Sequence, residues 1–177
     1  MENMDFIRSK TVCFTGHRKL RDPLSEVEDK VISLLEDLIQ RGYLYFFAGG
    51  ARGFDALASE AVLKLKEKYP QIHLVLVLPF YEQYKKDNGW KLSEIEQYQN
   101  LKERASKVIV LSPKYHSGIY HERNRYLVDN ASICIAYMSK IRSGSGYTVN
   151  YAITNKLEVV NISDNISPKS HKKTNPL

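Results

Sequence analysis

This sequence lacks the signatures of several common protein classes. It has two cysteines, Cys13 and Cys134, each in a short apolar run, so we expect buried free thiols and neither a disulfide nor a metal site. No apolar run approaches the ~20 residues that a membrane span requires, and no signal-peptide core follows the first ten residues. With 43% hydrophobic and 26% charged residues, the composition is ordinary for a soluble globular protein, and with no span or signal core we expect a cytoplasmic protein that does not contact membranes.

Two familiar phosphate-binding motifs are also missing around Gly49-Gly50. An apolar run over Tyr43–Ala48 ends at these glycines, and a helical pattern begins after Gly53. The stretch has neither the Lys-Ser/Thr of a P-loop nor the GxGxxG spacing of the dinucleotide fingerprint. A strand, a glycine turn and a helix still place free N–H groups and the positive end of a helix dipole where an anion can bind. A phosphate site and a purely structural turn both remain open.

Two charged residues accompany this turn. Arg52 supplies a permanent cation whose planar fork suits a phosphate group. Asp55 falls in the first turn of the predicted helix, where it can cap the helix or accept a hydrogen bond from a sugar hydroxyl.

Apolar runs that suit buried strands alternate with helical patterns along the chain. This alternation predicts an α/β protein with a three-layer Rossmann-like fold and a mostly parallel sheet of about six strands. We expect one domain over residues 1–162 and a disordered basic tail over residues 163–177, where polar residues and prolines dominate. The expected strands are Thr11–Thr15, Tyr43–Ala48, Gln71–Leu78, Lys107–Leu111, Ala131–Tyr137 and Leu157–Ile162.

The unusual residues follow the ends of these strands. In parallel sheets, ligands bind beyond the carboxyl ends of the strands, so we expect five loops to meet at one edge. The loops carry Gly16, His17 and Arg18; Gly49 to Gly53; Pro79 to Trp90; Tyr115 and His116; and Arg142 to Thr148.

The loop Arg142–Thr148 is the second candidate phosphate cradle. Gly144, Ser145, Gly146 and Thr148 lie at the start of a predicted helix over Tyr147–Thr154, so amide and hydroxyl donors face one point. A flexible loop with an ordinary helix cap would have the same composition.

Other polar residues offer weaker signals. His17 is interpreted as a structural residue, and Arg18 either pairs with Asp55 or binds phosphate. The histidines around Arg123 are too few for a metal site. Within this polar cluster, Arg123 is the better functional candidate, as an anion clamp. In the segment Tyr81–Trp90, the aromatic residues either stack on a base or pack the loop onto the domain.

The motifs FTGHR, AGGARGFDALASEAVL, YHSGIYHERNRYLVDNASICIAY and SGSGYTVNYA resemble the YpsA family of small bacterial proteins. That family belongs to the DprA/LOG-like (SLOG) group of Rossmann-like nucleotide-binding domains. The resemblance covers about Thr11 to Ile162 and implies a link to bacterial cell division or stress. Two of these stretches also resemble loops of the DNA-processing protein DprA.

The resemblance to LOG phosphoribohydrolases is incomplete. Their GGxGTxxE motif carries a catalytic Glu, and the matching position here holds Asn150 or Tyr151. Arg123 matches the family Arg, but Asn124 replaces the Lys that follows it. Because cleavage of a ribosyl bond needs a carboxylate, we expect binding and not hydrolysis, so an enzyme is not the favoured interpretation.

We therefore expect a sensor or regulator that binds a nucleotide such as ADP-ribose, NAD or AMP and requires no cofactor. A LOG-like N-glycosidase and a DprA-like single-stranded nucleic-acid binder are the alternatives, and tyrosine-rich loops allow a homodimer. The expected ligand-binding residues are Gly16, His17, Arg18, Gly49, Gly50, Arg52, Gly53, Asp55, Pro79, Tyr81, Trp90, Arg123, Asn124, Gly144, Ser145, Gly146 and Thr148.

Overall fold

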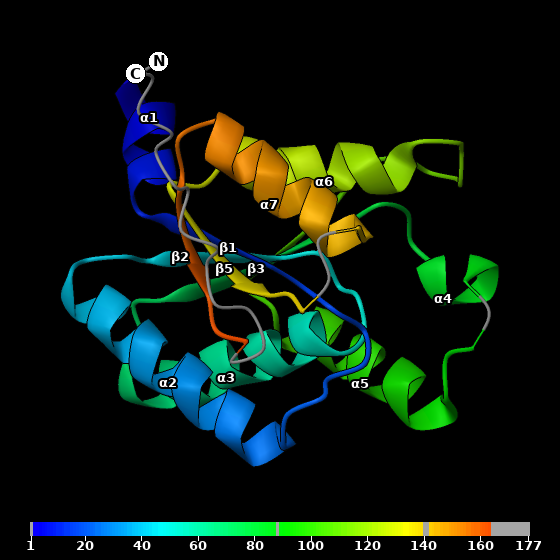
Figure 1. Ribbon diagram of the computed structural model, residues 1–177, viewed down its shortest axis with the longest axis horizontal. Coiled ribbons are helices and arrows are strands. Elements are labelled where there is room, and N and C mark those ends of the chain that lie inside the picture. Colours follow the sequence, from blue (N-terminus) through cyan, green and yellow to red (C-terminus); the bar gives the residue numbers. More distant parts are fainter. Residues whose placement is uncertain (1, 88, 140–141, 164–177) are drawn as a thin grey trace, which may run out of the picture.

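A computed structural model describes residues 2–87, 89–139 and 142–163 and confirms the α/β fold (Figure 1). Six strands form one sheet in the order β4-β3-β2-β1-β5-β6, and all of the strand pairs are parallel. The strands are β1 (Thr11–Gly16), β2 (Tyr45–Ala48), β3 (His73–Leu78), β4 (Lys107–Val110), β5 (Ile133–Tyr137) and β6 (Glu158–Asn161).

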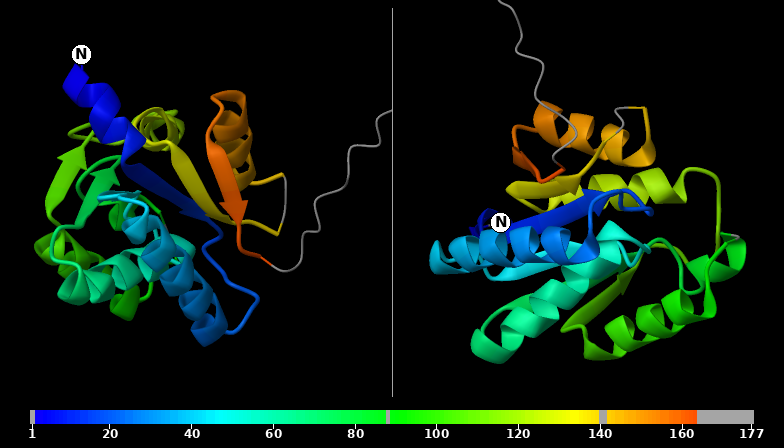
Figure 2. Two further views of the ribbon diagram at one scale, coloured as in Figure 1. Left: turned by 90° about the vertical axis from the view of Figure 1, so that its left-hand side faces the viewer. Right: turned by 60° about the horizontal axis from the view of Figure 1, so that its bottom comes forward.

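Helices cover both faces of this sheet and make three layers (Figures 1 and 2). In the view of Figure 1, α2, α3 and α5 lie below the sheet, and α6 and α7 lie above it. The helices are α1 (Glu2–Ser9), α2 (Leu24–Gln40), α3 (Phe54–Lys68), α4 (Gln83–Lys86), α5 (Leu92–Arg104), α6 (Ile119–Asp129) and α7 (Gly144–Thr154). Within the described ranges, none of them is both long and apolar enough to cross a membrane.

The apolar runs of the sequence are explained by these layers. In β1, Val12 and Phe14 belong to the core between the sheet and helices α2 and α3. Cys13 belongs to the core on the opposite face, between the sheet and helices α6 and α7. Strands β1, β3 and β5 are buried along nearly their whole length, while the edge strands β4 and β6 are more exposed. Cys13 and Cys134 are buried and lie opposite each other in register.

The strand order reverses between β1 and β5. The chain adds β2, β3 and β4 on one side of β1 and then returns to place β5 and β6 on the other side. In open parallel sheets the loops at such a reversal diverge to opposite faces and leave a crevice beyond the carboxyl ends of the strands. The topology therefore positions a binding site after β1, between the loops that follow β2 and β5.

Some elements differ from the prediction. Helix α1 and the short helix α4 were not predicted, and α7 begins at Gly144, three residues before the predicted start at Tyr147. The difference at α7 arises because Ser143 caps the helix, so the glycines and serines lie within its first turn. Residues 164–177 of the predicted tail lie outside the described residues.

Candidate ligand-binding site

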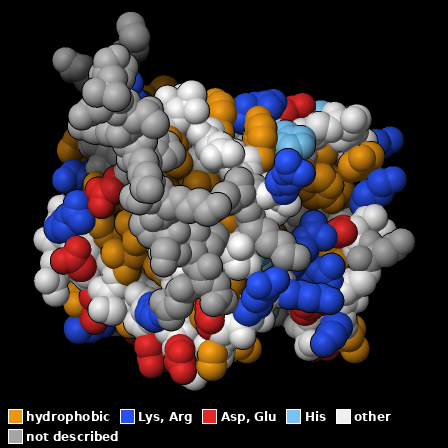
Figure 3. All heavy atoms as spheres, viewed as in Figure 1, with side chains coloured by type: hydrophobic (Ala, Val, Ile, Leu, Met, Phe, Trp, Pro, Cys, Tyr) orange, Lys and Arg blue, Asp and Glu red, His pale blue; other side chains and the backbone are white. Residues whose placement is uncertain are grey.

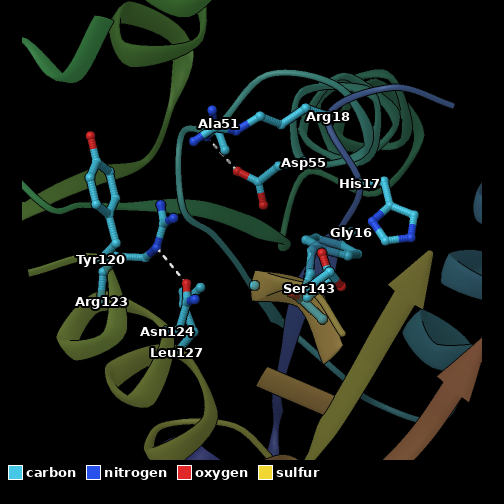
Figure 4. Close-up of a pocket in the computed structure, with 14 residues that line it drawn as sticks. Gly16, His17, Arg18, Ala51, Asp55, Tyr120, Arg123, Asn124, Leu127 and Ser143 are labelled. Carbon is cyan, nitrogen blue, oxygen red and sulfur yellow. Dashed lines mark hydrogen bonds between the residues drawn. The ribbon is translucent and has the colours of Figure 1, made fainter. Parts of the chain in front are cut away.

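A cavity of about 400 Å³ lies at the reversal point of the sheet (Figure 4). It joins the end of β1, the turn between β2 and α3, one side of α6, and the first turn of α7. Figure 4 shows Arg123 and Asn124 on one side, Asp55 and Arg18 above, and Gly16 and Ser143 on the opposite side. The lining residues are Phe14, Thr15, Gly16, His17, Arg18, Ala51, Asp55, Tyr120, Arg123, Asn124, Leu127, Ser143, Gly144 and Ser145.

The first turn of α7 presents free amides to this cavity. Ser143 caps the helix by accepting a hydrogen bond from the Gly146 N–H at 3.0 Å. The Gly144 and Ser145 amides come before the first residue that can bond back within the helix, and they find no acceptor in the described part of the chain. A Cβ built on Gly144 would meet no atom within 4 Å, so the space beside it is open. With the helix dipole, these amides form an anion site.

The glycine turn after β2 has a different role from the expected one. The Ala51 N–H donates to Asp55 Oδ2 at 2.8 Å, and the backbone of Gly49 and Gly50 acts to lower the pKa of this carboxyl, against the larger effect of its burial. The protein's own carboxylate therefore occupies the place that we expected a phosphate to take. Asp55 reaches it because it lies in the first turn of α3 and points back toward the turn (Figure 4).

Two glycines of this turn are required by close packing. At Gly49, an added Cβ would overlap Arg123 Nη1, so the missing side chain makes room for the guanidinium. Gly53 has a φ of 79° and passes close to the backbone of Arg18. These contacts bring the turn after β2 against both α6 and the loop after β1.

Arg123 and Asp55 are two buried charged residues at the wall of the cavity. Their exposed fractions are 8% and 5%. Arg123 donates through Nη1 to the Gly49 carbonyl and through Nε to Asn124 Oδ1 at 2.9 Å, which leaves guanidinium N–H groups for a ligand. Burial lowers the pKa of Arg123, and the charge of Asp55 partly offsets this shift. The two residues thus offer a cation and a hydrogen-bond acceptor in the same cavity.

The carboxyl of Asp55 should make stability depend on pH. Burial raises its pKa, and the Arg123 charge and the turn amides only partly oppose the increase. Since the folded state then holds the proton more tightly than the unfolded chain, this contribution is full below about pH 4 and is lost as pH rises through the raised pKa. We expect the free energy of unfolding of the wild type, minus that of Asp55→Asn, to fall between pH 4 and 7 in urea titrations. A pH-independent difference would contradict the shift.

Several predicted residues lie near the cavity without lining it. Arg52 donates to the Gly89 carbonyl, lies 3.6 Å from Glu94, and covers the ring of Trp90. Tyr81 is 60% exposed, and its carbonyl accepts a bond from Tyr98. Pro79, Tyr81 and Trp90 after β3 are therefore not brought into the cavity.

Other predicted residues have structural partners at the site. Arg18 lines the cavity and pairs with Asp87 at 2.7 Å, not with Asp55. The ring of His17 accepts a bond from the Ser139 N–H at 2.8 Å. Thr148 is buried and donates to the Gly144 carbonyl, and Gly146 is also buried, so neither lines the cavity.

Sequence reasoning missed Tyr120, Leu127, Ala51 and Ser143 as lining residues. Tyr120 and Leu127 lie three before and four after Arg123, so they share its face of α6. Helical spacing around Arg123 was the available signal for both of them.

Residues 13–164 match the YpsA family model, described as the YspA SLOG family. The chain belongs to this family. It is 27% identical over 140 residues to the uncharacterized SPbeta prophage-derived protein YoqJ of Bacillus subtilis, covering 72% of this chain and 80% of YoqJ. It is 24% identical over 146 residues to the UPF0398 protein YpsA of the same organism, covering 77% and 79%.

Two solved structures of DNA processing protein A (DprA) share the fold of this YpsA-family chain. The protein from Streptococcus pneumoniae has a TM-score of 0.62 at 19% identity, covering 93% of this chain and 55% of that one. The protein from Helicobacter pylori, described with a single-stranded DNA binding mode, has a TM-score of 0.59 at 17% identity, covering 89% and 66%. This chain therefore spans only part of those proteins.

Proposed function

We propose that this protein binds a nucleotide-type ligand in the cavity at the reversal point and acts as a sensor or regulator. The ligand's phosphate would bind the Gly144 and Ser145 amides together with Arg123, and a ribose hydroxyl would donate to Asp55. The observation that carries the proposal is that one cavity combines free helix amides, a buried guanidinium and a buried carboxylate. Donors for an anion and an acceptor for a hydroxyl suit a sugar phosphate.

The arrangement favours a ligand with one phosphate, of the AMP type, over ADP-ribose or NAD. In a dinucleotide, a second phosphate near the β2 turn would meet the Asp55 carboxylate, because that carboxylate already takes the Ala51 amide. Two neighbouring anions repel each other strongly where one of them, the Asp55 carboxylate, is buried away from water. A single phosphate at α7 avoids the repulsion.

The same geometry supports binding over hydrolysis. Asn150 is exposed on α7, and the Tyr151 hydroxyl donates to Asp129 at 2.9 Å; neither lines the cavity. Neither position of the missing Glu therefore brings a carboxylate to a bound sugar. Release of free base from AMP by the purified protein would revive the N-glycosidase alternative.

Nucleic-acid binding is the second candidate, because the Helicobacter DprA structure is described with single-stranded DNA. Base stacking needs free aromatic faces. Here Arg52 covers Trp90, and Lys86 Nζ lies 4.5 Å from the ring centre of Tyr115. Tyr81 in the same segment is 60% exposed, so the small ligand is favoured by the cavity and not by the aromatic residues. A homodimer stays a prediction.

Ser145→Asp tests the proposal while sparing the fold. A carboxylate in the first turn of α7 favours the helix dipole but repels a phosphate at the same amides. We expect the wild type to gain about 2.7 kcal/mol of stability from AMP at a hundred times its dissociation constant, and Ser145→Asp to bind at least ~10-fold more weakly. Thermal unfolding and calorimetry measure both effects.

Ser93→Asp is the matched control, since Ser93 is the second residue of α5 as Ser145 is of α7. This variant should bind AMP as the wild type does. Equal affinity of Ser145→Asp and the wild type for AMP would show that the phosphate does not bind at the first turn of α7. The proposed function would be refuted if none of AMP, ADP-ribose and NAD stabilised the wild type at millimolar concentration.

A further inference from the structure

Arg18 connects the cavity to a neighbouring segment that contains the chain's single tryptophan. Its guanidinium lines the cavity, and its Nη1 lies 2.7 Å from Asp87 Oδ2. The two side chains are 48% and 24% exposed. Because water screens both charges, such an ion pair is weak and yields to a partner of higher charge in a less hydrated place. A phosphate in the cavity is such a partner.

Asp87 also contacts Trp90. The same Oδ2 atom that meets Arg18 accepts a hydrogen bond from Trp90 Nε1 at 3.4 Å. The Trp90 ring packs edge-on against Tyr98, with the ring centres 5.6 Å apart. A change in the partners of Asp87 therefore changes the surroundings of the indole. We call residues 80–87 and 89–91 the Trp90 segment.

Tyr120 brings an unpartnered polar group to the cavity. Among the described residues, its hydroxyl is buried and has no hydrogen-bond partner, although its ring lines the cavity. Burial raises the pKa of this hydroxyl. A buried hydroxyl without a partner is unfavourable, which favours any state that gives it an acceptor.

On the basis of the proposed function, we propose that a phosphate bound in the cavity draws Arg18 away from Asp87. Occupancy of the cavity then changes the Trp90 segment. The segment carries the exposed side chains of Tyr81 and Lys85. Basic side chains gather on the right of Figure 3, where Figure 1 places α4. This surface would signal that the ligand is bound.

Trp90 emission and calorimetry on the full chain, with AMP as the probe, test this coupling. In the wild type, the emission should change along the same binding curve that calorimetry gives. Asp87→Asn keeps the side-chain shape and an acceptor for Trp90 but no longer competes for Arg18. It should bind AMP about two- to five-fold more tightly, with less than half of the emission change.

Glu82→Gln is the matched control, because it removes a 2.8 Å ion pair with Lys85 in the same segment but outside the cavity. It should match the wild type in affinity and emission. If AMP binds and Asp87→Asn keeps the affinity and full emission change of the wild type, the coupling is overturned while the proposed function stands. If none of AMP, ADP-ribose and NAD binds the wild type, both are overturned.

Discussion

Gly53→Ala is expected to lower the free energy of unfolding by about 3 kcal/mol or more. Gly53 precedes α3 with φ 79° and ψ −128°, a conformation that residues with a Cβ avoid. The added Cβ would also overlap the Arg18 carbonyl oxygen and lie 2.5 Å from its Cα. Because both atoms belong to the backbone, no side-chain rotation relieves the clash. Urea unfolding measures the loss.

Gly144→Ala is the matched control for stability. Gly144 is the first residue of α7, and a Cβ there would meet nothing within 4 Å. Its effect should stay within about 0.5 kcal/mol, as for ordinary exposed substitutions. If Gly53→Ala were as mild as this control, the loops after β1 and β2 would not approach each other as described, and the cavity between them would lose one wall.

The fold could be predicted from the sequence because its signals are local. A strand covered by helices on both faces is a continuous apolar run, as His73–Leu78 shows, and the helices between such runs have their own periodicity. The order of the strands is not a local property. Nothing in the apolar pattern places β5 beside β1, so the reversal point, and with it the centre of the site, emerged only from the structure.

Within the candidate site, sequence placed residues at the correct edge but could not assign their partners. Arg18, Asp55, Arg123 and Gly144 all line the cavity. The spacing did not show that Asp55 turns back onto the Ala51 amide, or that Arg18 pairs with the distant Asp87. A charged side chain takes whichever opposite charge the fold brings near it, and this depends on contacts far apart in the chain. The Tyr120 hydroxyl had no sequence signal for the same reason.

The opposite buried charges of Arg123 and Asp55 lead to the second large effect. Arg123→Met should lower the free energy of unfolding by about 3–5 kcal/mol, because it leaves the Asp55 carboxylate buried without its counter-charge. Asp55→Asn should also destabilise the protein, since the Arg123 charge then lacks its partner. Each single variant leaves one uncompensated charge in a site that water reaches poorly.

The double variant Asp55→Asn/Arg123→Met removes both charges, and the amide side chain that replaces the carboxylate keeps an acceptor for the Ala51 N–H. It should be less destabilised than the sum of the two single variants by about 1–3 kcal/mol, as measured by a double-mutant cycle in urea. Additive effects would mean that the two charges do not stabilise each other. A positive coupling would show that the two charges stabilise each other in the fold. Loss of AMP binding in the double variant would show that the same two charges also hold the ligand.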